Sequence, residues 1–210
     1  MKSIRRKWHR ARRMAAALVK DRRGVAAIEF AMIVPIMLVL FFGTVEFSSG
    51  VAVDRKVTLI ARTLSDLTSQ SVATVTDGYL QNVFTASISI MYPYVATPTN
   101  ATLSEIYVSS TNVATIQWSK SATIQTGATQ ATLTTSSRHY NDNVTSIVPT
   151  QLLVPKTYLI LSEVSYLYTP TIGYVMAKAG VTLQDVAYTR PRQVTCLSYN
   201  SVPATTCPLP

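Results

Sequence analysis

The feature that most constrains this chain is an apolar run close to its N-terminus. Val25–Val45 comprises 21 residues, and all of them are apolar or small apart from Glu29 and Thr44. A helix of this length, at about 1.5 Å per residue, matches a hydrocarbon core roughly 30 Å thick. The run therefore predicts a transmembrane helix over residues 25–47, so only the segment after it is left to build a folded domain.

The net charge of +9 sets the orientation of this helix. Ten of the 19 Lys and Arg residues precede Gly24, where Asp21 is the only acid, and from Val25 onward nine basic residues balance nine acidic ones. Because basic flanks stay on the cytoplasmic side, we expect a cytoplasmic N-terminus, a single membrane pass and an extracytoplasmic C-terminal part. A charge excess confined to one short arm does not describe a nucleic-acid-binding surface, so we expect no nucleic acid among the partners.

The basic arm, residues 1–24, carries an apolar stripe of its own. The spacings of four and three are those of one helix face, and the residues are Ile4, Trp8, Ala11, Ala15 and Leu18. A basic amphipathic helix beside a membrane span is typical of a segment that lies on the anionic inner leaflet. A plain cytosolic tail that only sets the topology explains the charges as well, and both interpretations stay open.

The helical pattern continues beyond the membrane segment, over residues 48–75. Apolar residues again recur at spacings of four and three: Val53, Val57, Ile60, Leu64 and Leu67. No helix breaker lies between Val51 and Thr76, so the pattern predicts one helix of about fifty residues whose outer half is amphipathic.

The remainder, residues 76–210, predicts an α+β head. Thr76-Asp77-Gly78 is a turn and N-cap signal, and Tyr79–Ile90 is a second, shorter helix that ends before Pro93. From Ala101 the period changes to two. The fold class is therefore a long helix, a short helix and then an antiparallel sheet of about four strands.

Four strands follow from this period of two. Ile106 and Val108 alternate with polar neighbours, then Ala114, Ile116 and Trp118 do the same, and Thr111-Asn112 between them predicts a hairpin. Tyr158–Tyr168 and Val181–Tyr188 are two further strands. Ser119–Ser137, rich in Ser, Thr, Ala and Gln, is expected to be a loop with at most a weak strand.

The two cysteines, Cys196 and Cys207, lie close together near the C-terminus. In an exported head they meet an oxidising compartment, where a pair that closes a small loop normally forms a disulfide. We therefore expect a Cys196–Cys207 disulfide, with two unpaired thiols as the alternative.

Glu29 is the residue in the apolar run that most needs an explanation. A charge in a membrane segment costs about 2.5–3.5 kcal/mol at the centre and less near an edge. One explanation is that Glu29 lies in the headgroup region, solvated or paired with Arg23. The other is that the carboxylate has a partner inside an apolar assembly.

The stretch from Arg22 to Phe30 resembles the cleavage region of type IV prepilins and pseudopilins. These proteins have a basic leader, a Gly, and a hydrophobic helix whose fifth residue after the cut is Glu, and Gly24 and Glu29 stand in this relation. The resemblance implies that a prepilin peptidase cuts between Gly24 and Val25. Cleavage would create an α-amine at Val25, which a carboxylate one turn away on another subunit could neutralise.

The resemblance extends to the TadE-like family over Gly24–Gly50. It rests on the AIEFAMIVPIML core with Pro35 and on the Glu46-Phe47 pair, and more loosely on VSYLYTP and TRPRQ near the C-terminus. It implies a minor pilin or pseudopilin of the tight-adherence (Flp) pilus in the bacterial inner membrane, with a role in cell adhesion. Glu29, Phe30, Pro35 and Glu46 would then serve packing between subunits. Val25 departs from the Phe that many type IV pilins carry after the Gly.

The resemblance also implies the partners: a prepilin peptidase, sister minor pilins, the major pilin and the inner-membrane assembly platform. The residues themselves argue against catalysis. Only His9 and His139 are available, and the sequence contains no G-x-S-x-G, Walker or H-E-x-x-H motif. We therefore expect no enzymatic activity, no cofactor and no metal.

Two alternatives from other classes stay open. Phe30–Phe42 followed by Ser48-Ser49-Gly50 also fits a conventional signal peptide, which would release a secreted domain. A permanently anchored extracytoplasmic binding domain, whose leader is never removed, fits the same residues. Neither alternative involves a pilus.

Overall fold

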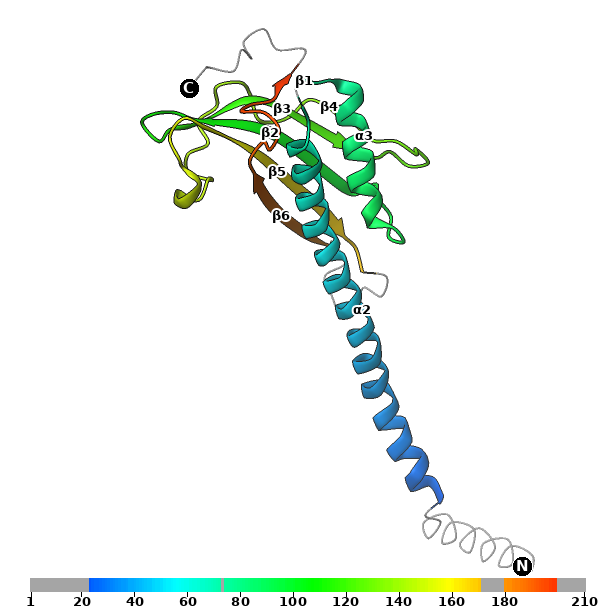
Figure 1. The fold of residues 1–210 in the computed structure, drawn as a ribbon. Coiled ribbons are helices and arrows are strands. Elements are labelled where there is room, and N and C mark those ends of the chain that lie inside the picture. Colours follow the sequence, from blue (N-terminus) through cyan, green and yellow to red (C-terminus); the bar gives the residue numbers. More distant parts are fainter. Residues whose placement is uncertain (1–22, 73, 171–179, 200–210) are drawn as a thin grey trace, which may run out of the picture. The chain divides into compact units, whose positions relative to one another are not determined.

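The computed structural model describes residues 23–72, 74–170 and 180–199. The chain divides into two compact units, Met1–Phe47 and Ser48–Pro210, and each is described by itself. Helix α2 (Arg23–Ser69) supplies residues to both units (Figure 1). The predicted amphipathic helix of the basic arm lies outside the described residues.

In the first unit, α2 contains the whole apolar run. The helix is continuous through Pro35, although the proline cannot donate the hydrogen bond that Ala31 O would accept. Among the described residues, α2 is the one helix long and apolar enough to cross a membrane. The predicted long N-terminal apolar helix is therefore confirmed.

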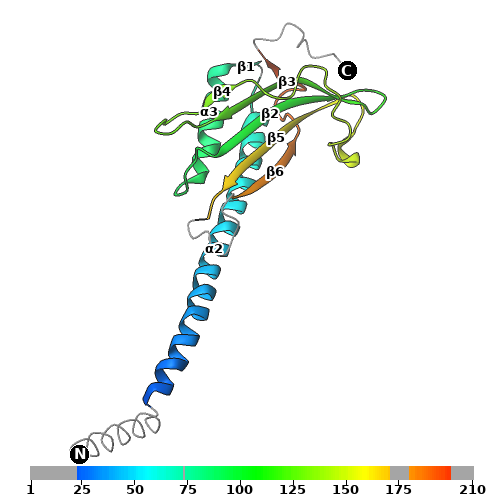
Figure 2. The same ribbon diagram turned by 180° about the vertical axis from the view of Figure 1, so that it is seen from behind.

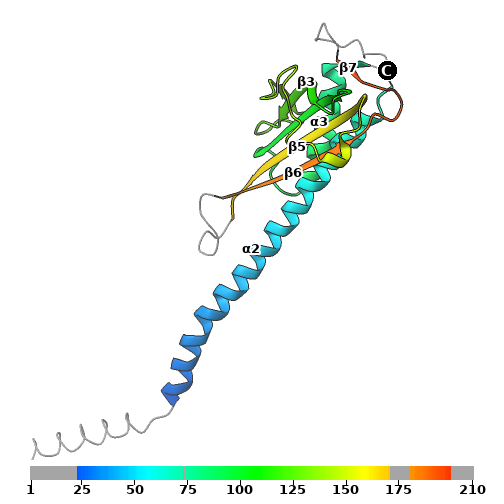
Figure 3. The ribbon, with the colours of Figure 1, turned by 90° about the vertical axis from the view of Figure 1, so that its left-hand side faces the viewer.

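The second unit is an α+β fold, as predicted, built on a five-stranded antiparallel sheet (Figure 2). The strand order is β4-β3-β2-β5-β6. The bounds are β2 (Thr99–Val108), β3 (Ala114–Thr123), β4 (Thr132–Thr134), β5 (Thr157–Tyr168) and β6 (Val181–Thr189). The outer part of α2 and the shorter α3 (Asp77–Ile88) lie on the same face of this sheet (Figure 3).

The predicted apolar stripe of the outer part of α2 is buried in this unit. Val53, Val57, Ile60 and Leu64 are all 0% exposed, and Leu67 packs against the same core. The core also takes residues from α3 and from the helix-facing side of the sheet. Sheet and helices thus bury the stripe that the sequence pattern left without a partner.

α2 ends at Ser69, six residues before the predicted boundary. Its last turns carry hydroxyl side chains that bond to the helix's own carbonyls, Thr68 Oγ1 to Leu64 O and Ser69 Oγ to Asp66 O. Such bonds compete with helix continuation. The chain then forms β1 (Thr74–Val75), which pairs in parallel with β7 (Ser198–Tyr199). This two-stranded pair was not predicted, because its members are 124 residues apart in sequence.

The start of α3 follows the predicted cap. Thr76 has extended backbone geometry, and its side chain accepts a hydrogen bond from the backbone N–H of Tyr79 at 3.2 Å. The helix ends at Ile88 and passes into a short 3₁₀ turn, η1 (Ser89–Met91). Lys56 of α2 donates to the carbonyl of Ile90 within this turn and to that of Tyr92 directly after it, each at 2.8 Å. This ammonium group ties the segment that follows α3 to α2.

The predicted hairpin is confirmed, with Asn112 in the left-handed region at φ 61° between β2 and β3. The expectation that Ile116 and Trp118 point to the same side of the sheet was wrong. A register shift between Glu105 and Ile106 leaves Gln117 as an extra residue on β3, so Ile116 and Trp118 face different cores. A β-bulge explains this, because one inserted residue reverses the side to which the following side chains point.

The side of the sheet away from the helices carries a second, smaller core. Ile106, Ile116 and Leu159 lie in it with Val144 and Val148, which come from the long connection between β4 and β5. That connection also contains a second 3₁₀ turn, η2 (Thr150–Leu152). β4 itself forms within Ser119–Ser137, where at most a weak strand was expected.

Glu105 is a carboxyl buried inside the head. It is 1% exposed, and its two oxygens accept hydrogen bonds from Trp118 Nε1 at 3.0 Å and from the backbone N–H of Leu197 at 2.6 Å. Burial raises the pKa of this carboxyl to about 8. The two hydrogen bonds lower the pKa, but their effect is smaller than that of burial. Glu105 thereby ties the C-terminal segment, including the Tyr199 ring stacked on Trp118, to the centre of the sheet.

This geometry predicts that the head loses stability as the pH rises. The folded-state pKa of Glu105 lies above its ordinary value of 4.5, so the folded protein holds a proton that the unfolded chain releases. The free energy of unfolding should therefore fall by up to about 1.4 kcal/mol per pH unit between roughly pH 5 and 8, and then level off. Denaturant unfolding of the wild type and of Glu105→Gln across this range measures the effect. The Glu105→Gln chain should show a shallower slope, whereas identical slopes would show that Glu105 ionises normally.

Candidate functional site

The N-terminal part of α2 is apolar on every side. Large apolar side chains between Val25 and Phe47 are exposed throughout the unit, among them Ile28 at 63%, Phe30 at 69% and Phe41 at 62%. A helix that is hydrophobic all round is stable only when it is surrounded by lipid or by other apolar helices. This segment is therefore the first candidate site, as a surface for packing.

Glu29 lies within this apolar surface, exposed between Ile28 and Phe30. It is four residues after Val25, so the two lie about one helical turn apart on the same side of α2. Thr44, the other polar residue of the run, satisfies its own hydroxyl by donating to Leu40 O at 2.8 Å. A carboxylate has no equivalent local solution, because helix carbonyls are acceptors and cannot donate to it.

Within the described residues, no contact of Gly24 requires a glycine. A Cβ added to it would meet no atom within 4 Å, and its backbone is that of an ordinary helical residue. Glycine in a helix costs roughly 1 kcal/mol relative to alanine.

The predicted packing residues do not form one cluster. Glu29 and Glu46 are 17 positions apart on α2, or about 26 Å along its axis. Phe30 is 69% exposed, whereas Glu46 is 4% exposed. Pro35 lies between them inside the helix. Any subunit contact that uses all four residues would therefore extend along most of the membrane segment.

Cys196 is 6% exposed, just before Leu197, which Glu105 holds. Cys207 lies outside the described residues, so the disulfide stays a prediction. Its expected effect is to hold the proline-rich C-terminus after the last strand, with a stabilisation of roughly 3 kcal/mol.

The disulfide can be tested without reducing the protein. Mass spectrometry of the chain taken from the cell envelope and alkylated under non-reducing conditions should find neither Cys196 nor Cys207 modified. After reduction both should be alkylated, which is the control for accessibility. Modification of both residues before reduction would show that the pair does not form.

The described residues hold no group of three or more His, Cys, Asp or Glu side chains suited to a metal ion. His139 is exposed, and its backbone N–H donates to the Asp142 carboxylate at 2.6 Å, while Nδ1 lies 3.6 Å from the same group. This is a local turn contact with no nucleophile attached to it.

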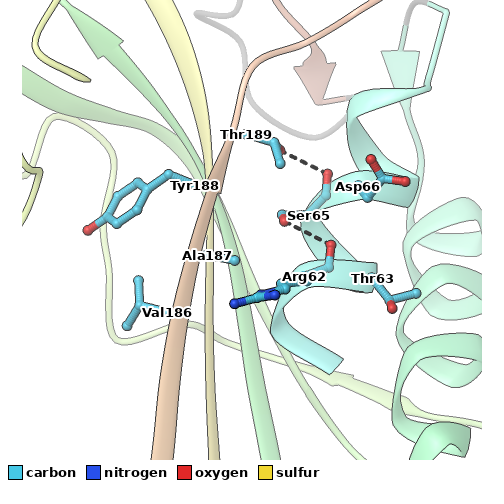
Figure 4. Close-up of a pocket in the computed structure, with 8 residues that line it drawn as sticks. All are labelled: Arg62, Thr63, Ser65, Asp66, Val186, Ala187, Tyr188 and Thr189. Atoms are coloured by element: carbon cyan, nitrogen blue, oxygen red, sulfur yellow. Dashed lines mark hydrogen bonds between the residues drawn. The ribbon is translucent and has the colours of Figure 1, made fainter. Parts of the chain in front are cut away.

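A groove of about 500 Å³, which the sequence did not predict, lies between α2 and β6 (Figure 4). Its walls are Arg62, Thr63, Ser65 and Asp66 from the helix, and Val186, Ala187, Tyr188 and Thr189 from the strand. No motif marks these residues, because the two halves are more than 120 positions apart in sequence. The one sequence signal was Arg62, a charged residue on the flank of the buried stripe.

Comparison with known proteins relates part of the chain to a protein family. The family model described as TadE-like protein matches residues 24–64, which include Gly24, Glu29 and Pro35. The resemblance expected from the sequence is thereby confirmed for this segment. No curated protein and no solved structure matches the chain.

Proposed function

We propose that this chain, which matches the TadE-like model over residues 24–64, is a non-catalytic, pilin-like subunit that assists assembly of a tight-adherence pilus. A prepilin peptidase would remove the basic leader after Gly24. The mature helix would then pack with the major pilin, sister minor pilins and the inner-membrane assembly platform. The head would lie outside the cytoplasm.

The observation that carries this proposal is the composition of the exposed helix surface. The run from Val25 to Val45 is apolar on all sides and long enough to span a bilayer, and it holds one carboxylate, Glu29, within its first turns. A lipid-facing anchor alone needs no such carboxylate, and carrying one there is costly. A packing surface between subunits gives it a use.

The use follows from the chemistry of cleavage. Cutting after Gly24 leaves a positive α-amine on Val25 at the beginning of the helix, where the helix dipole adds partial positive charge. When subunits pack side by side, this amine enters an apolar bundle and has to be compensated. Glu29 of a neighbouring subunit supplies the opposite charge one turn further along the helix.

Replacing Gly24 with leucine tests the cleavage step. Because nothing lies within 4 Å of the site, the substitution leaves the helix intact, and only recognition by the peptidase should fail. Co-expressed with the peptidase, Gly24→Leu should migrate about 24 residues heavier than the wild type on a gel. Ala31→Leu, which places the same side chain elsewhere on the exposed helix, is the control and should be cut normally. Identical migration of wild type and Gly24→Leu would refute cleavage at this position.

Replacing Glu29 with glutamine tests the packing step. Glutamine is isosteric and polar, so Glu29→Gln should still insert into the membrane and be cut after Gly24. It leaves the Val25 amine of the neighbour uncompensated, which costs about 3–5 kcal/mol for a buried pair. The variant should therefore fail to co-purify with sister pilins and fail to support piliation.

Asp54→Asn, at an exposed acid beyond the membrane segment of the same helix, is the matched control and should behave as wild type. Normal filaments from cleaved Glu29→Gln protein would refute the pairing of Glu29 with the Val25 amine. That result would leave the predicted membrane topology unaffected.

A further inference from the structure

The groove between α2 and β6 is bordered by an open sheet edge. β6 is the last strand in the order β4-β3-β2-β5-β6, and no other strand of the described chain pairs with its outer side. Its nine residues, Val181–Thr189, form a longer edge than the three of β4 at the opposite side. A long edge strand offers a row of backbone donors and acceptors to any extended chain that approaches it.

The register identifies which backbone groups point outward. Alternate residues of an antiparallel strand direct their N–H and C=O groups to opposite sides. The N–H of Val186 donates to Oδ1 of its neighbour Asp185 at 2.7 Å, as suits an amide directed away from β5. Gln184, Val186 and Tyr188 therefore form the set whose backbone groups face the open edge.

The helix side of the groove contributes an uncompensated cation. In Figure 4, the Arg62 side chain reaches from α2 toward Ala187 of β6. Arg62 is exposed and makes no ion pair within the described residues, although Asp66, one turn on, is bound by Arg192. In a second, smaller hollow, by contrast, Arg138 is held by Glu163 at 2.5 and 2.8 Å. The groove at β6 thus presents a guanidinium free to bind a carboxylate.

At one end of the groove, two hydrogen bonds join the strand to the helix. Thr189 Oγ1 donates to Ser65 O at 3.1 Å, and the backbone N–H of Arg192 donates to Ser69 O at 2.9 Å. These two bonds fasten the end of β6 to α2. The four β6 residues that line the groove span about 13 Å, enough to pair with an extended segment of about four residues.

We propose that this groove binds an extended acidic segment of a partner protein by strand addition to β6. The backbone of the segment pairs with the outward groups of Gln184, Val186 and Tyr188, and the Val186 N–H leaves Asp185 Oδ1 to do so. One acidic side chain of the segment forms an ion pair with Arg62. Main-chain pairing supplies affinity, and the arginine supplies selectivity for a carboxylate at one position.

A second copy of this chain fits the edge less well. Asp185 is the central residue of β6, so full-length antiparallel pairing of two β6 strands would place two Asp185 side chains directly opposite each other. Like charges in that position are destabilising. No acidic residue of a second β6 would then lie beside Arg62, because Asp185 is the only charged residue of the strand.

The proposal can be tested with a fluorescent peptide and the full chain in detergent micelles. The probe is the acetylated and amidated peptide TVEVT, compared with TVQVT and with TVEVT methylated at its two valine amides. Fluorescence polarisation should show binding of TVEVT, binding of TVQVT weaker by about tenfold, and no binding of the methylated peptide. Hydrogen exchange at Val186 and Tyr188 should slow when TVEVT is bound.

Variants of the chain make the assignment specific. Arg62→Gln should bind TVEVT about tenfold more weakly and no longer distinguish it from TVQVT, whereas Arg55→Gln, an exposed arginine of α2 outside the groove, should behave as wild type. Equal binding of TVEVT to wild type and Arg62→Gln, or undiminished binding of the methylated peptide, would overturn the proposal. Failure of TVEVT to bind would also overturn the proposal. So would dimerisation of the chain that depends on its concentration and protects the β6 amides from exchange without any peptide.

Discussion

The structure depends on how helix α2 satisfies its apolar surface. In the first unit this surface surrounds the helix, and most of its large apolar side chains between Val25 and Phe47 are exposed. In the second unit it narrows to one stripe, which the sheet and α3 bury completely at Val53, Val57, Ile60 and Leu64. The same 47-residue helix therefore holds the fold together over one part and needs an apolar environment from outside over the other.

The second unit is built around that stripe. Three contacts fix its periphery: Lys56 binds carbonyls in and directly after η1, Thr189 binds Ser65, and Glu105 holds the backbone at Leu197. Each of them joins elements that are distant in sequence. The groove at β6 exists because the second contact brings the end of the edge strand to α2, while the rest of the edge stays open.

Sequence patterns predicted the elements whose signals are local. The helical stripe of α2, the Thr76 cap and the hairpin at Asn112 all follow from spacings of a few residues. Strands β5 and β6 follow from their own apolar and β-branched composition.

Features that depend on distant partners were not predicted. The β1–β7 pair joins strands of two residues each that are far apart in the sequence. The bulge at Gln117 changes the face of Trp118, and no glycine marks it in the sequence. Strand β4 is only three residues long, which is too short for a clear alternating pattern. Glu105 lies in a strand as a lone acid, and only the fold reveals that Trp118 and Leu197 meet it. At the candidate site, Gly24 and Glu29 came from local spacing, whereas the groove containing Arg62 required the tertiary structure.

The central claim is that the chain is cut after Gly24 so that its exposed apolar helix can pack with other subunits. N-terminal sequencing of the mature protein, purified from membranes of cells that express the peptidase, tests this claim most directly. The account predicts Val25 as the first residue. A first residue near Val51 would identify a secreted domain released by a signal peptidase, and an intact Met1 would identify a permanent anchor, and either result would contradict it.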